Sequence, residues 1–95
     1  MATKSKLEQA VEAMMDSLNP AQRELVRSQL SEYRQNKARM ARIDAQLVAL
    51  EPRNAHSINE VRLQQAQRAS LSYERSQLAI ANSRIATELS ELLNI

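Results

Sequence analysis

Apolar residues recur at intervals of three and four along three stretches of the chain, the spacing of one face of an α-helix. The first predicted helix, at about residues 5–18, opens with Ser5 and Glu8 spaced as a capping box and carries Leu7, Val11 and Leu18 on one stripe. Asn19-Pro20 is both its end and the next start, because asparagine caps a helix and proline suits the first helical position.

The second predicted helix runs from about residue 20 to residue 51 without a breaker, about 48 Å at 1.5 Å per residue. Pro52 ends it, and residues 52–57 form a loop that Ser57 closes as the cap of a third helix at about residues 58–93. The two long helices carry a near-heptad seam that serves as core or oligomer contact. We assign to this seam Val26, Leu30, Tyr33, Met40, Leu47, Leu78, Ile85, Leu89 and Leu92.

Composition narrows this pattern to one fold class. The chain has no Gly, no Phe, no Trp and only two Pro, whereas sheets and tight turns depend on such residues. We predict a single all-α domain, a long antiparallel helical hairpin resembling a coiled coil, with the short N-terminal helix packed at its open end. This arrangement places residues 20–33 beside residues 76–95 and brings Tyr33 near Tyr73.

Charge is unevenly distributed along this hairpin. The net charge is +2, yet residues 34–68 sum to +4 while the flanking segments are each slightly acidic. Such a basic arm binds duplex phosphates, docks on an acidic protein surface, or is a solvated helix face. The candidate contact residues are Arg34, Lys37, Arg39, Arg42, Arg53, Arg62 and Arg68. Lys37 and Asp44, in or beside the seam, further predict a pairing of specified register.

The residues that carry enzyme chemistry are scarce in this sequence. It has no Cys and one histidine, His56, which falls in the predicted tip loop, and no spacing typical of a metal site. Residues 43–53 resemble a segment of helical chorismate mutases, but the Asp44-to-Arg53 spacing is off by one and Pro52 interrupts the helix. We expect a cytoplasmic, non-enzymatic protein with no cofactor, no metal, no membrane segment and no small-molecule substrate.

The entry Ser17-Leu18-Asn19-Pro20-Ala21, the Arg- and Gln-rich hairpin and the leucine-rich ending at residues 85–95 resemble phage terminase small subunits. The resemblance implies a homo-oligomer that binds duplex DNA at a packaging site and hands it to a large motor subunit, with the hairpin as the oligomerisation element. These 95 residues depart from that family in showing no pattern of a separate helix-turn-helix domain. The alternative is a small helical adaptor or inhibitor, encoded by a phage or mobile element, that binds a protein or nucleoprotein.

Overall fold

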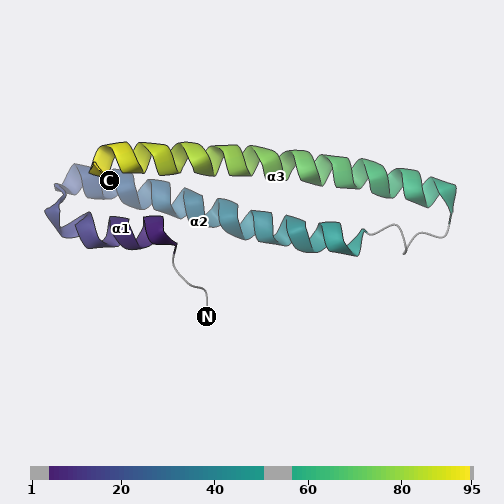
Figure 1. The fold of residues 1–95 in the computed structure, drawn as a ribbon, viewed down its shortest axis with the longest axis horizontal. Coiled ribbons are helices and arrows are strands. Elements are labelled where there is room, and N and C mark those ends of the chain that lie inside the picture. Colours follow the sequence, from purple (N-terminus) through teal and green to yellow (C-terminus); the bar gives the residue numbers. More distant parts are fainter. Residues whose placement is uncertain (1–4, 51–56, 95) are drawn as a thin grey trace.

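The protein is a helical rod, seen in a computed structural model that describes residues 5–50 and 57–94. Its elements are α1 (Lys6–Met14), a 3-10 turn η1 (Met15–Ser17), α2 (Pro20–Ala49) and α3 (Ile58–Leu93). The two long helices lie antiparallel along a molecule 59 Å long, and α1 folds back along the end where α2 begins and α3 finishes (Figure 1). The predicted all-α hairpin with a third helix at its open end is confirmed.

Side-chain caps fix where the helices begin. The hydroxyl of Ser5 accepts from the Glu8 amide at 3.2 Å, and that of Ser57 accepts from the Glu60 amide at 3.1 Å. At the start of α2, Asn19 and Gln22 form a reciprocal capping box, with bonds of 2.8 and 3.1 Å. These bonds satisfy amide groups that have no partner within the helix, so all three predicted starts are confirmed.

The end of the first helix differs from the prediction. Regular α-helix stops at Met14 and tightens into η1, where Arg23 of α2 donates to the carbonyls of Met15 and Asp16 at 3.0 and 3.1 Å. Arg23 therefore satisfies two carbonyls that the backbone amides of a longer α-helix would otherwise have satisfied. The predicted stop at Pro52 and the tip loop lie outside the described residues.

The hydrophobic core sits at the three-helix end. Its buried cluster joins all three helices and comprises Val11, Leu18, Val26, Leu30, Ile85, Leu89 and Leu93. Each such side chain contributes about 1.5–3 kcal/mol when fully withdrawn from water. Farther along the hairpin, Ile43 is fully buried between the two long helices. The core is therefore heavier at the open end of the hairpin.

Polar pairs set the alignment of α2 against α3. Asn82, 7% exposed, accepts from the Asn36 amide at 2.9 Å and donates to the Tyr33 carbonyl at 3.2 Å. Asn82 is thus level with residues 33–36 of α2. The prediction that Tyr33 lies near Tyr73 is wrong, because Tyr73 lies nine residues from Asn82, about 13 Å along the axis of α3. The error arose because the loop and seam spacing alone did not fix the register.

Candidate interaction surfaces

Two of the predicted basic contact residues hold α1 against α2. Arg34 donates to the buried carboxylate of Glu8 at 3.1 Å and lies 3.7 Å from Glu12. Lys37 approaches Glu8 at 3.9 Å, and its ammonium group lies 5.5 Å from the centre of the Tyr33 ring. Both cations therefore have partners within the chain, at the place where α1 packs on α2.

The Glu8 carboxylate illustrates the balance of forces in this cluster. Burial raises the pKa of Glu8, but the hydrogen bond and charge of Arg34, then the charge of Lys37 and the hydrogen bond from Ser5, together lower it below its ordinary value. The ionised form is the one that the folded protein favours. Glu8 thus links the N-terminal helix electrostatically to the hairpin.

Two more of the predicted contact residues join α2 to α3. Arg39 forms a two-pronged ion pair with Glu74, with bonds of 3.1 and 2.8 Å, and this hydrogen bonding lowers the pKa of Glu74. Arg68 donates to the carbonyls of Leu47 and Leu50 at 2.9 and 3.5 Å, where it satisfies the end of α2. These two arginines have structural roles in the hairpin.

Two predicted cations remain exposed without such contacts. Among the residues that the structure describes, Arg42 on α2 and Arg62 on α3 have no acidic or hydrogen-bonding partner. Asp44, which the sequence placed in or beside the seam, pairs with Arg75 of α3 at 2.6 Å. Because this ion pair sets Arg75 level with Asp44, Arg42 lies opposite a point on α3 about 14 residues from Arg62, so the two cations are about 20 Å apart along the rod. Arg53 and His56 lie outside the described residues.

The predicted seam residues all face the interior of the hairpin. Val26, Leu30, Ile85 and Leu89 are buried, whereas Tyr33, Met40, Leu47, Leu78 and Leu92 are partly buried. They pack within one chain and do not form the outer surface of the hairpin.

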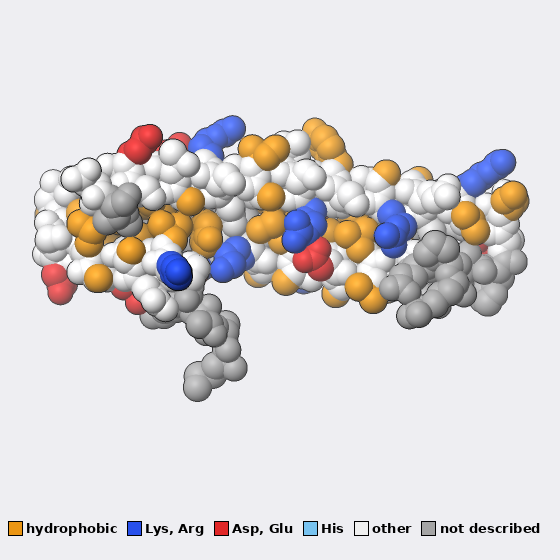
Figure 2. All heavy atoms as spheres, in the orientation of Figure 1, with side chains coloured by type: hydrophobic (Ala, Val, Ile, Leu, Met, Phe, Trp, Pro, Cys, Tyr) orange, Lys and Arg blue, Asp and Glu red, His pale blue; other side chains and the backbone are white. Residues whose placement is uncertain are grey.

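The outward face of α3 is the surface that the sequence reasoning missed. Between Leu63 and Ser83 the only charged residues are Arg68, Glu74 and Arg75, and all three contact α2. The fully exposed positions of this stretch are Ala, Ser, Gln and three large apolar side chains: Leu63, Tyr73 and Ile80 are 60%, 69% and 52% exposed. The edge of the rod formed by α3 is accordingly white and orange along its middle (Figure 2).

The opposite helix makes the contrast clear. Over a stretch of similar length, α2 exposes charged residues at regular intervals. They are Glu24, Arg27, Glu32, Arg34, Lys37, Arg42 and Asp44. A solvated helix face resembles α2, whereas charge depletion with exposed aromatic and aliphatic residues is typical of the centre of a protein interface. In the sequence, the repeat of apolar and small residues at three- and four-residue spacing on the outward side of α3 could have indicated this surface.

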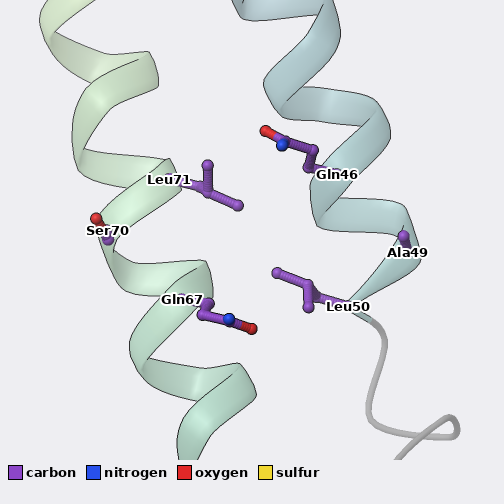
Figure 3. Close-up of a pocket in the computed structure, with 6 residues that line it drawn as sticks. All are labelled: Gln46, Ala49, Leu50, Gln67, Ser70 and Leu71. Carbon is purple, nitrogen blue, oxygen red and sulfur yellow. The ribbon is translucent and has the colours of Figure 1, made fainter.

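An open groove lies between the long helices near the end of α2. It has a volume of about 430 Å³ and is lined by Gln46, Ala49, Leu50, Gln67, Ser70 and Leu71. Leu50 and Leu71 point toward the space between the helices (Figure 3). Its walls carry no charged group, so it offers neither an acid-base pair nor an anchor for a charged ligand.

Residues 5–50 and 57–94 contain no group of three or more metal-ligating side chains. No helix among them combines the length and apolar character needed to cross a bilayer.

The chain matches no family model, no curated protein and no solved structure.

Proposed function

We propose that this chain is a non-enzymatic assembly protein that works as a helical oligomer, in the manner implied by its resemblance to terminase small subunits. The observation that carries the proposal is the uncharged outward face of α3 between Leu63 and Ser83. Tyr73 and Ile80 lie on this face with more than half of their surface in water. Both side chains are exposed within one chain, so burying them between chains would stabilise an oligomer through the hydrophobic effect.

The shape of the molecule favours the same role. Helix α3 extends as a single 36-residue element, and its partner α2 covers only one side of it. A rigid helix with one covered and one uncharged face has the geometry of a subunit in a helical bundle.

The oligomer is tested by absolute mass from light scattering over a concentration series. We expect a mass above the 10.8 kDa of one chain, rising with concentration to a plateau at a whole number of subunits. A constant 10.8 kDa at all concentrations would contradict the proposal and favour the small-adaptor alternative, in which another protein covers the face.

A second candidate function, binding of duplex DNA, is favoured by Arg42 and Arg62. Both are exposed and lack an acidic partner in the described structure. Two phosphate contacts per chain predict a slope of about −2 in the logarithm of the binding constant against that of salt concentration. Contacts this few make binding by one chain weak, so useful affinity depends on several copies acting together.

The DNA candidate is tested with the double variant Arg42→Glu/Arg62→Glu in a duplex-binding titration at two salt concentrations. We expect binding to be lost while the helical circular dichroism signal stays unchanged. A matched control, Arg27→Glu on the exposed surface of the three-helix end, should retain binding. Equal binding by all three proteins would rule out this arm as the DNA contact.

A further inference from the structure

A second seam runs along the outward face of α3. Starting at Ala66, exposed residues follow one another at alternating intervals of three and four, the spacing of a coiled-coil contact. The seam comprises Ala66, Ala69, Tyr73, Ser76, Ile80 and Ser83, all exposed. It lies apart from the inward seam that packs on α2, where Asn82, Ile85 and Leu89 are buried.

We propose that this outward seam binds the outward seam of a second copy of the chain, with the two α3 helices antiparallel. The inference rests on the proposed assembly function and adds the contact surface, the orientation and the register. The contact is isologous, because the same residues contribute from both copies across a twofold axis.

The sizes of the seam residues determine the orientation. Tyr73 and Ile80 share one of the two alternating seam positions, seven residues apart, whereas Ala69, Ser76 and Ser83 occupy the other. A parallel pair would set like against like, so that Tyr73 met Tyr73 and Ser76 met Ser76. The helices would then be alternately too close and too far apart for continuous packing.

An antiparallel pair sets each position opposite the other kind, so every large side chain meets a small one at a constant helix spacing. Among the antiparallel registers, the one that buries most apolar surface against apolar surface packs Ile80 against Ala69 of the second copy. Tyr73 then lies against Ser76, and Ala66 lies against Ser83. A shift by seven residues would place Ile80 on Ser76 instead, which buries less apolar surface against apolar surface.

Charge and area both suit a second copy as the occupant. Each chain carries a net charge of +2, and the six seam positions bring no like charges together across the contact. A specific interface needs about 1,200 Å² in total, hence about 600 Å² per copy, or about 60 Å² from each of some ten outward residues. A tyrosine alone can bury about 150 Å² or more, so the outward residues of α3 can supply the area that a small specific interface needs.

The absence of cysteine from the chain allows a clean cross-linking experiment. Ala66→Cys and Ser83→Cys leave Tyr73 and Ile80 untouched, and the proposed register brings residue 66 of one copy to within disulfide distance of residue 83 of the other. Each variant is oxidised alone and in an equimolar mixture, one of the two isotopically labelled, and the dimers are assigned by mass spectrometry. Val48→Cys, exposed on α2, reports chance collisions.

We expect the mixture to yield labelled–unlabelled dimers at least tenfold above the Val48→Cys background, and each variant alone to stay near that background. Strong self-linking of Ala66→Cys would indicate a parallel pair and overturn the inference. An oligomer by light scattering with no cross-link above background would also overturn it, while leaving the proposed assembly function standing. A monomer by light scattering would reject both.

Discussion

Individual polar residues decide how the helices of this protein are aligned. Glu8 ties α1 to α2 through Arg34, and Asn82 ties α3 to α2 through Asn36 and the Tyr33 carbonyl. A buried polar group that loses its partner costs about 1–3 kcal/mol, so each pair disfavours every alignment except the one observed. The alignment of α1 and α3 on α2 thus depends on these few polar side chains.

Replacing Glu8 with Gln tests its ion pairs. The folded state lowers the pKa of Glu8, so its contribution to stability is present above the unfolded-state value of about 4.3 and is lost as pH falls through the lower folded value. We expect Glu8→Gln to cost about 1–3 kcal/mol at pH 7 and to flatten the loss of stability toward pH 3. Urea unfolding at both pH values measures this, with exposed Glu32→Gln as the control. Identical pH dependence in wild type and Glu8→Gln would refute the role.

Replacing Asn82 with Leu tests the buried amide pair. The single substitution strands the Asn36 amide, so we expect a loss of about 1–3 kcal/mol in the free energy of unfolding. Asn36→Leu/Asn82→Leu should restore most of that loss, because an apolar pair replaces a polar one of similar size. Urea unfolding measures both variants. A double variant less stable than the single one would show that the amide pair contributes more than alignment.

At the scale of the helices, starts were predictable from sequence and ends were less so. Ser5, Asn19 and Ser57 cap helices as their local sequence indicates, because a cap depends on residues three positions away. The end of α1 depends on Arg23, which reaches it from α2. The pairing of Arg39 with Glu74 likewise depends on the register of the hairpin, which no local pattern encodes.

Stability at this scale should come from the three-helix end. Leu89 is fully buried there, so Leu89→Ala should cost about 2–5 kcal/mol through lost burial and the cavity left behind. Arg75→Ala, which removes an exposed ion pair with Asp44 that water and salt screen, should cost far less. Thermal or urea unfolding of the two variants measures the contrast. Similar costs for both would mean that core packing does not dominate.

At the scale of the whole molecule, the hairpin divides its surfaces between two roles. The inward seams of α2 and α3 pack on each other, and the outward seam of α3 stays in water within one chain. The sequence predicted the rod, and it gave the cations of residues 34–68 as candidate contact residues. The fold uses four of them, Arg34, Lys37, Arg39 and Arg68, to bind other parts of the chain. The sequence alone could not distinguish these paired cations from the exposed ones, because their partners depend on how α1, α2 and α3 are aligned.

Sedimentation equilibrium of the wild type beside Ile80→Lys tests the assembly most directly, with Val48→Lys as a control that places the same charge on exposed α2. We expect wild type and Val48→Lys to approach at least twice the chain mass of 10.8 kDa, and Ile80→Lys to stay at 10.8 kDa with unchanged helicity. A wild type that remains at 10.8 kDa, or an Ile80→Lys variant that associates as the wild type does, would contradict the proposed assembly.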